Sequence, residues 1–290
     1  MKEFKLIATD MDGTLLNDVS LVDKKDYETL QRLNKKGINT VLVTGRILSM
    51  VEVYYKTMPF IKYVISANGA SIDDVHNNLT IAQNFIDLNL INKILDYTSE
   101  NKIECNLLSR EVCYFPKNSV RIKRFERYNE IAKANNYKEM KLLRFNELEA
   151  IENIEKILIY TKDQEKITKI LNFLNELDVT LTQSDFGLIE VSSKGITKGY
   201  GLRKLREHLN LEKENIIAFG DFYNDESLFL ESGFRVAMGN AVPKLKEKAD
   251  FITKTNAEQG ISYILNKMEE NNEIWKSSTW FRFPPRLRRW

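Results

Sequence analysis

The stretch that decides the fold joins an apolar run to an acidic turn near the amino terminus: Phe4-Lys5-Leu6-Ile7-Ala8-Thr9, then Asp10-Met11-Asp12-Gly13-Thr14. The compact apolar run predicts a buried strand, and the turn places two carboxylates directly at its end. In an open parallel sheet, ligands bind beyond the carboxyl ends of the strands. We therefore expect Asp10 and Asp12 to lie in a functional site.

Strand and helix signals alternate on both sides of a central region. Near the amino terminus the pattern predicts strands at 4–9, 38–44 and 63–67, with helices at 23–36 and 47–58. Near the carboxyl terminus it predicts strands at 215–219, 234–238 and 251–253, with helices at 198–209, 224–231, 241–249 and 257–270. Such alternation is typical of the α/β class, in which helices cover both faces of a parallel sheet.

The pattern changes between residues 84 and 187. Long helices are predicted at 88–100 and 164–177, with paired strands at 103–108 and 112–115, and at 156–160 and 179–184. We interpret this segment as an α+β insertion that splits one α/β domain, since the ends of a host segment lie close together at such loops. The predicted domains are a core of residues 1–83 and 188–270 and an insertion of residues 84–187.

The last twenty residues differ from the rest of the chain. Residues 271–290 hold all three tryptophans and five basic residues against one glutamate, so they carry a net charge of +4. We expect a disordered, appended tail; the alternative is an anchor for an anionic or membrane surface.

The whole chain carries +2, which leaves about −2 for the remainder, so no nucleic-acid partner is expected. No run reaches 18 apolar residues, which predicts no transmembrane segment and, by default, a cytoplasmic location.

The acidic turn suits phosphoryl transfer. One carboxylate can attack phosphorus and form an aspartyl-phosphate, and we assign this role to Asp10. A neighbour two residues on, Asp12, can move a proton to the leaving oxygen and from the incoming water. Gly13, directly after Asp12, permits a tight turn that brings backbone N–H groups toward the anion. The plainer interpretation is an Asp-Gly turn whose Asp10 is solvated.

Three further elements favour the catalytic interpretation. The second strand ends in Thr44-Gly45-Arg46, and a hydroxyl followed by glycine suits a phosphoryl oxygen. Lys198 opens a helix, where a cation could neutralise a transferring phosphoryl group, although a solvated lysine is the alternative and Lys194 lies nearby. The fourth element follows an apolar strand and reads Gly220-Asp221-Phe222-Tyr223-Asn224-Asp225.

The carboxylates of these elements predict a metal. Asp10, Asp12, Asp221 and Asp225 would repel one another in one pocket unless a cation joined them. Mg²⁺ is the natural choice, because it takes oxygen ligands and the chain has only two histidines. The proposed metal-binding set is therefore Asp10, Asp12, Asp221 and Asp225.

The four elements, in this order, resemble the haloacid dehalogenase superfamily of phosphatases. The resemblance covers residues 1–83 and 188–270 and implies a Rossmann-like, doubly wound parallel sheet with an inserted α+β cap domain. It also implies that Asp10 is the nucleophile and Asp12 the general acid/base. Asp221 would join Asp10 and the Asp12 carbonyl on Mg²⁺, and Asp225 would support the metal or orient Lys198. The phosphate-binding set implied is Thr44, Gly45, Lys198 and Asn224.

The position of the insertion resembles the Cof-type branch, which has a large α/β cap between the second and third motifs. Asn68, in Ser66-Ala67-Asn68-Gly69-Ala70, fits this branch near the substrate, and Arg46 is expected to line the entrance. The function implied is a magnesium-dependent phosphatase acting on a small phosphorylated metabolite, such as a sugar phosphate or a phosphorylated cofactor. The alternatives are a phosphomutase of the same superfamily and a binding module with a disabled site. Neither the substrate nor the oligomeric state follows from the sequence.

Overall fold

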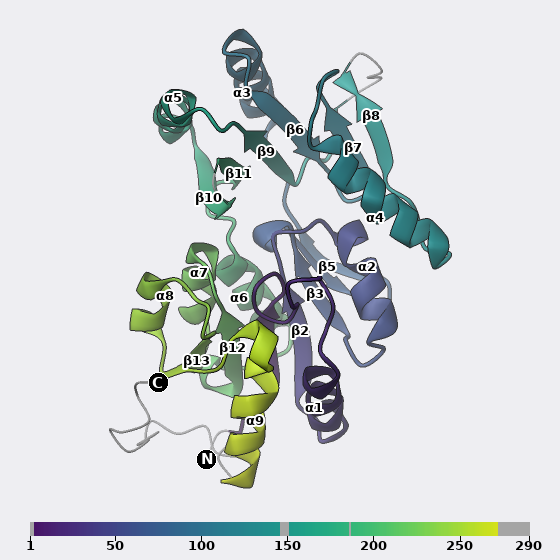
Figure 1. The fold of residues 1–290 in the computed structure, drawn as a ribbon, viewed down its shortest axis with the longest axis vertical. Helices are drawn as coiled ribbons and strands as arrows, with labels where there is room; N and C mark the ends of the chain where they lie inside the picture. Colours follow the sequence, from purple (N-terminus) through teal and green to yellow (C-terminus); the bar gives the residue numbers. More distant parts are fainter. Residues whose placement is uncertain (1–2, 146–150, 186, 272–290) are drawn as a thin grey trace.

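The computed structural model describes residues 3–145, 151–185 and 187–271, and it contains two sheets (Figure 1). The larger has eight strands in the order β14-β13-β12-β1-β2-β3-β4-β5. Their bounds are β1 Leu6–Asp10, β2 Asn39–Val43, β3 Tyr63–Ser66, β4 Ser71–Asp74, β5 Leu79–Gln83, β12 Ile216–Gly220, β13 Phe234–Ala237 and β14 Phe251–Ile252. Strands β14 to β3 run parallel, and the β4–β5 hairpin adds an antiparallel edge.

The chain winds outward from β1 in both directions, through β2 and β3 on one side and through β12 to β14 on the other. Because such crossovers are right-handed, this winding covers both faces of the sheet with helices. The helices of this part are α1 Lys24–Lys35, α2 Leu48–Thr57, α6 Lys198–His208, α7 Glu226–Phe229, α8 Pro243–Lys248 and α9 Gly260–Glu270.

Helix α1 illustrates how local signals and packing agree. The Asp23 side chain caps its amino terminus by accepting a hydrogen bond from the Lys25 N–H, and Leu30 and Leu33 are buried on one face. On its flank, Arg32 pairs with Glu269 of α9 at 2.7 Å. The two helices therefore pack side by side, and α9 closes the core near the carboxyl end of the described chain.

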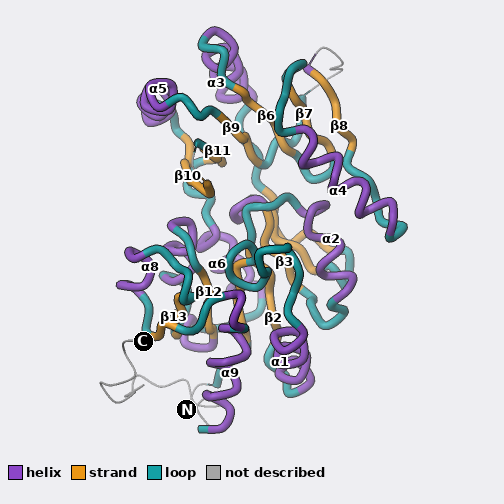
Figure 2. The backbone as a smooth tube through the Cα atoms, in the orientation of Figure 1, coloured by secondary structure: helices purple, strands orange, loops and turns teal. Residues whose placement is uncertain are grey.

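The smaller sheet has six strands in the order β10-β11-β9-β6-β7-β8. We call the residues that form it and its helices, 86–193, the cap. Its elements are α3 Leu88–Glu100, β6 Glu104–Leu108, β7 Val112–Phe115, α4 Ile122–Ala134, β8 Lys141–Arg144, β9 Lys156–Tyr160, α5 Gln164–Asn175, β10 Val179–Asp185 and β11 Leu188–Ser193. Figure 2 shows its strands as a group separate from those of the larger sheet, joined to them by loops.

The cap corrects two sequence predictions. Strand β11 pairs with β9 and β10, so residues 188–193 belong to the cap and the boundary lies after Ser193 rather than before Leu188. The predicted pairing of strands 156–160 and 179–184 is also wrong, because β11 lies between them. Strands β4, β5 and β8 were not predicted, since their short sequences carry polar residues and weak alternation. The predicted β6–β7 pair is confirmed.

Alternate residues of the cap strands face opposite sides, as the two-residue period of a strand requires. Leu107 and Ile157 pack with α3 and α5 on the outer face. Leu108 and Leu158 point the other way, toward α4 and the larger sheet, where they meet Ile47 and Met50 of the core. The inner face of the cap therefore lies over the region where the acidic turn is found.

The predicted α/β class, with a doubly wound core and an inserted α+β unit, is confirmed by this architecture. No helix among the described residues is long and apolar enough to cross a membrane. The predicted disorder of residues 271–290 falls, apart from Asn271, outside the described part of the chain.

Candidate active site

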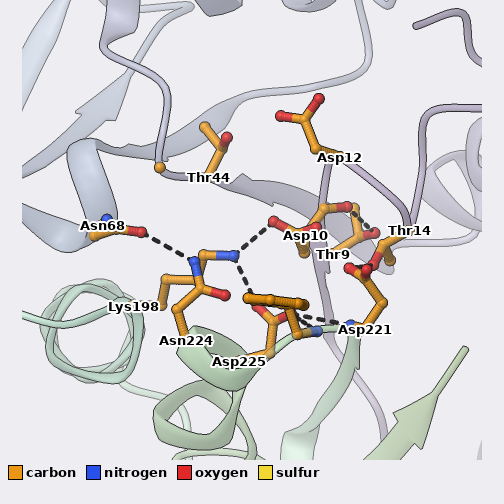
Figure 3. A network of polar contacts seen from close by, with 12 residues as sticks. Thr9, Asp10, Asp12, Thr14, Thr44, Asn68, Lys198, Asp221, Asn224 and Asp225 are labelled. Atoms are coloured by element: carbon orange, nitrogen blue, oxygen red, sulfur yellow. Dashed lines mark hydrogen bonds and ion pairs between the residues drawn. The ribbon is translucent and has the colours of Figure 1, made fainter. Parts of the chain in front are cut away.

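The site forms at the carboxyl end of β1, the strand from which the chain winds outward in both directions. Asp10 is the last residue of β1, and Asp221 directly follows the adjacent parallel strand β12. Thr44 follows β2 on the other side of β1. Parallel strands end at the same edge, so these polar side chains converge at the topological switch point of the sheet (Figure 3).

Lys198 is buried at the centre of this group. It is the first residue of α6, whose amino terminus is capped by the Thr197 side chain. Its Nζ lies 2.6 Å from Asp10 Oδ1 and 2.7 Å from Asp225 Oδ1. Burial alone would lower the pKa of Lys198, but these two carboxylates outweigh it and raise the pKa. The ammonium group is therefore held in its charged form.

Lys194 is excluded from this site. It forms a surface ion pair with Asp178 at 3.4 Å, and both side chains are well exposed. Of these two lysines, Lys198 has the burial and the carboxylate partners that a phosphoryl-neutralising cation needs.

Three carboxylates form a compact acidic cluster. Oxygen atoms of Asp10, Asp221 and Asp225 lie within 4.8 Å of one another. Burial raises the pKa of Asp10, and repulsion from Asp225 and Asp221 adds to this effect. Burial and the nearby Asp225 also raise the pKa of Asp221, to about 6. Such a group of hard, mutually repelling oxygen donors fits a divalent cation of the Mg²⁺ type.

Asp225 has little capacity left to ligate a metal directly. Its Oδ1 accepts from Lys198, and its Oδ2 accepts the backbone N–H groups of Asp221 and Phe222, each at 3.0 Å. The geometry thus favours the second of the two roles considered for Asp225, the orientation of Lys198.

Gly13 and Thr14 hold Asp221 in place. Gly13 has φ +81°, and a Cβ at this position would lie 2.4 Å from Asp221 Oδ2. The Thr14 hydroxyl donates a hydrogen bond of 2.9 Å to Asp221 Oδ1. The acidic turn therefore supplies Asp10 and also shapes the position of the carboxylate on the next strand.

The Asp12 side chain departs from the prediction of a four-carboxylate cluster. It turns away from Asp10 and forms a two-pronged pair with Arg46, whose Nε lies 2.8 Å from Asp12 Oδ2. Burial would raise the pKa of Asp12, but Arg46 outweighs it and lowers the pKa. The reason is electrostatic and geometric. The Arg46 guanidinium attracts the Asp12 carboxylate and matches its two oxygens, whereas the other three carboxylates would repel it. A metal contact through the Asp12 carbonyl stays a prediction.

Asn68 connects the catalytic edge to the cap. Its backbone, with φ +55°, lies between Ala67 and Gly69, which also have positive φ. Its Nδ2 donates to Glu190 Oε2 of the cap, and its Oδ1 accepts from Asn224 Nδ2 at 3.3 Å. Left-handed backbone at a non-glycine residue is costly and concentrates at functional sites. The amide is thus held between the Gly-Asp-x-x-Asn motif and β11.

A buried ion pair completes this connection. Lys156 Nζ lies 2.8 Å from Glu190 Oε1, both side chains are about 5% exposed or less, and Lys156 also donates to the Gly45 carbonyl oxygen. Gly45 has no side chain to block this approach: a Cβ there would lie 3.3 Å from Glu190 Oε2. A cap charge pair therefore contacts the loop that holds Thr44.

A cavity of about 290 Å³ lies between the cap and the catalytic edge. Its floor carries the acidic cluster and Lys198, and its cap wall carries aliphatic, aromatic and charged side chains. The lining comprises Asp10, Asp12, Thr44, Gly45, Arg46, Ile47, Met50, Leu108, Arg121, Arg124, Phe125, Lys156, Leu158, Leu188, Glu190, Lys198, Asp221, Phe222 and Asn224.

Comparison with known proteins identifies the family. The family described as haloacid dehalogenase-like hydrolase matches this sequence over residues 7–265. The chain belongs to this family. Of the sequence predictions, the haloacid dehalogenase superfamily and the enzyme class, a phosphatase of this type, are thereby confirmed.

Similar proteins support the assignment of this chain to the hydrolase family, and they match it over almost its whole length. The 5-amino-6-(5-phospho-D-ribitylamino)uracil phosphatase YcsE of Bacillus subtilis (strain 168) is 32% identical over 266 residues, covering 90% of this chain and 94% of that protein. YwtE of the same organism, which bears the same enzyme name, is 29% identical, covering 91% and 98%. A solved structure of a haloacid dehalogenase-like hydrolase from B. subtilis has a TM-score of 0.79 at 30% identity, covering 91% and 99%.

The sequence analysis of this hydrolase did not predict the cap residues that contact the site. Glu190 interrupts an apolar strand, in Leu188-Ile189-Glu190-Val191, and Lys156 begins one, in Lys156-Ile157-Leu158-Ile159. A charged residue within a buried strand requires a partner, and that signal could have indicated the pair. Nothing local indicates that the partners would be each other and Asn68.

The buried ion pair leads to a stability prediction. Glu190→Gln leaves the Lys156 ammonium buried without its counter-charge, so the free energy of unfolding is expected to fall by about 3 kcal/mol. The Lys156→Met, Glu190→Gln double variant should recover at least half of this loss. Urea unfolding followed by circular dichroism measures both.

The control is Glu165→Gln, which breaks an exposed pair with Lys169 and should change little. Wild-type stability of the Glu190→Gln variant would show that the pair is not what holds these residues together.

Proposed function

We propose that this hydrolase is a magnesium-dependent phosphatase that removes phosphate from a small phosphorylated metabolite through an aspartyl-phosphate on Asp10. The observation that carries the proposal is the buried contact of Lys198 with Asp10 and Asp225, next to the acidic cluster at the end of β1. A carboxylate nucleophile, a fixed cation and hard oxygen donors at one point suit the transfer of a charged phosphoryl group.

In the first step Asp10 attacks phosphorus and the alcohol departs. Lys198 lies against Asp10, so it can neutralise the charge of the phosphoryl oxygens as they approach. Asp225 holds Lys198 in this position through its own carboxylate. Thr44, Gly45 and Asn224, which line the same cavity, are the proposed partners of the remaining phosphoryl oxygens.

Asp12 is the proposed general acid and base. Its lowered pKa leaves it ionised at rest, which suits the second step, in which it takes a proton from the water that attacks the aspartyl-phosphate. In the first step it must carry a proton to the leaving alkoxide. An incoming phosphate dianion raises the pKa of Asp12 by like-charge repulsion, which favours that protonated form.

Asp10 and Asp221 are the proposed carboxylate ligands of Mg²⁺, with the Asp12 carbonyl as a further oxygen. When bound, Mg²⁺ would screen the repulsion between these carboxylates and a phosphate dianion, and it would favour the ionised nucleophile.

The cavity and the relatives support a proposal for the substrate class. A cavity of about 290 Å³ suits a small metabolite rather than a polymer. Two relatives are named as phosphatases of a ribitylaminouracil phosphate, a phosphate ester on a polyol chain. We infer that this hydrolase also acts on a phosphate monoester of a small polyol, sugar or cofactor.

A phosphate-release screen tests this proposal. The protein in Mg²⁺ is incubated with p-nitrophenyl phosphate and a panel of sugar, polyol and cofactor phosphates, including 5-amino-6-(5-phospho-D-ribitylamino)uracil. We expect release from the aryl ester and a kcat/KM at least about 100-fold higher for one class of metabolite, because cap contacts contribute only with the correct leaving group. No release from any ester would contradict the proposal, and transfer to a second position of a sugar would indicate the mutase.

A further inference from the structure

Most of the cations that line the cavity are paired with carboxylates of the cavity wall. Three of the lining cations have carboxylate partners within the cavity wall: Lys198 with Asp10, Arg46 with Asp12, and Lys156 with Glu190. Among the described residues, the side chain of Arg124 makes no hydrogen bond or ion pair, although it lines the same cavity. Arg121 lies beside it on the cavity wall.

Helix α4 presents these two arginines on one side. Residues three apart lie on the same face of a helix, so Arg121 and Arg124 are neighbours, one at the start of α4 and one in its first turn. Arg121 is positioned by the ring of Tyr160, 5.1 Å from its guanidinium carbon. Phe125, which is buried against Phe115, anchors the helix to the cap sheet.

The pair lines the same cavity as the proposed reacting groups, where the transferring phosphate already has a cation of its own in Lys198. The field of Arg124 reaches Asp12, where it contributes to the lowered pKa. In the proposed mechanism the phosphoryl group would face Lys198 and the acidic cluster on the floor of the cavity. Two guanidinium groups side by side repel each other, and a guanidinium fork binds carboxylate or phosphate oxygens with particular geometric fit.

An apolar wall accompanies the two cations. Leu108, Leu158 and Leu188 come from three neighbouring strands of the cap sheet and line the cavity together with Phe125. This wall suits a carbon skeleton that crosses the cavity from the phosphate toward α4, because burial of apolar surface is favourable there.

We propose that Arg121 and Arg124 form a subsite for a second anionic group, so that the preferred substrate is a phosphate monoester whose leaving group carries a carboxylate or a second phosphate. This inference rests on the proposed function, and it specifies the part of the substrate that the cap reads. The reacting phosphate binds at Asp10 and Lys198, and the second anion binds at the amino-terminal end of α4.

Matched pairs of esters test the subsite. Glucose 6-phosphate and 6-phosphogluconate differ by a carboxylate, and fructose 6-phosphate and fructose 1,6-bisphosphate differ by a phosphate. Wild-type kcat/KM is expected to be at least tenfold higher for the anionic member of one pair, as a charge-assisted hydrogen bond allows. The pair that shows the preference identifies which anion the subsite takes.

Two arginines of the same helix make a matched comparison. Arg124→Gln should lose about tenfold in kcat/KM on the ester with the second anion, mainly through KM, while the ester that lacks the second anion should change much less. Arg127→Gln removes the same charge from an exposed position of α4 outside the cavity and should change neither ester. Both side chains are exposed, so both variants should keep the wild-type melting temperature.

Three results would overturn the inference: equal rates on both members of each pair in the wild type, an equal loss on both members in Arg124→Gln, or an equal effect of Arg127→Gln. An equal loss on both members would indicate that Arg124 binds the reacting phosphate. An equal effect of Arg127→Gln would indicate that the preference comes from long-range electrostatics rather than from a subsite. Calorimetric binding of both members of each pair to the Asp10→Asn protein measures the same preference without turnover. Absence of turnover on every ester therefore contradicts the proposed function, while equal binding contradicts only the subsite.

Discussion

Asp10→Asn is expected to lower kcat on p-nitrophenyl phosphate by at least about 10⁴-fold. The amide keeps the size of the side chain and can still accept the hydrogen bond from Lys198, but it has no anionic oxygen to attack phosphorus. Loss of a nucleophile in other enzymes costs a factor of this order or more. Steady-state release of p-nitrophenol measures the change.

The variant must remain folded for this result to count. Asp225 stays as a carboxylate partner for Lys198, so the melting temperature should remain within a few degrees of the wild type. Rapid acid quenching with labelled substrate should trap a hydroxylamine-sensitive acyl phosphate in the wild type and none in Asp10→Asn. A folded Asp10→Asn protein with near wild-type turnover would eliminate Asp10 as the nucleophile.

Removal of Mg²⁺ should reduce activity by at least about 100-fold, and added Mg²⁺ should restore it. Burial and mutual repulsion raise the pKa values of Asp10 and Asp221, so without a cation the ionised form of the nucleophile is less favoured and phosphate is repelled. Dialysis against EDTA, followed by titration with Mg²⁺, measures the effect on turnover. Full activity in chelator would exclude the metal role.

A thermal-shift assay tests the same site without turnover. Mg²⁺ that binds the folded state raises the melting temperature, and the increase should be larger at pH 8 than at pH 5. The sign follows from Asp221: its pKa of about 6 in the folded state lies above the usual value, so protons compete with Mg²⁺ as the pH falls below 6. Asp221→Asn should abolish the shift, whereas Asp178→Asn, which removes an exposed surface carboxylate, should retain it. Equal shifts in both variants would place the cation elsewhere.

The sheet edge that carries the candidate site was largely predictable from the sequence. Asp10, Thr44 and Asp221 each follow an apolar segment, and parallel strands of one sheet end at the same edge. Lys198 was predictable from its place at a helix start, and the structure brings it into direct contact with Asp10. Local patterns thus indicate both the elements and the edge at which their polar ends meet.

The side-chain partners at this edge were less predictable. Asp12 was expected with the other carboxylates, yet Arg46, 34 residues away, draws it aside. Asn68 was expected near the substrate, but its contact with Glu190 spans 122 residues. Hydrophobic periodicity, with a repeat of 2 residues in strands or 3.6 in helices, does not indicate such pairings. They depend on how the cap and the core are placed relative to each other.

The strand order shows the same division. No strand was predicted at 188–193, and these residues were placed in the core because the insertion was taken to end at residue 187. Their pairing with β9 and β10 puts them in the cap, because the hydrogen-bonding partners of a strand are chosen by long-range packing rather than by its own residues.

The sequence by itself therefore determined the α/β core, the presence of an insertion and the residues at the strand ends, since these follow from hydrophobic periodicity and from the geometry of parallel sheets. Only the tertiary structure decided which groups face the cavity from the cap, how Asp12 is oriented and that Asp225 holds Lys198. These features rest on contacts between residues far apart in the chain, whose free energy comes from burial and charge pairing in the folded molecule.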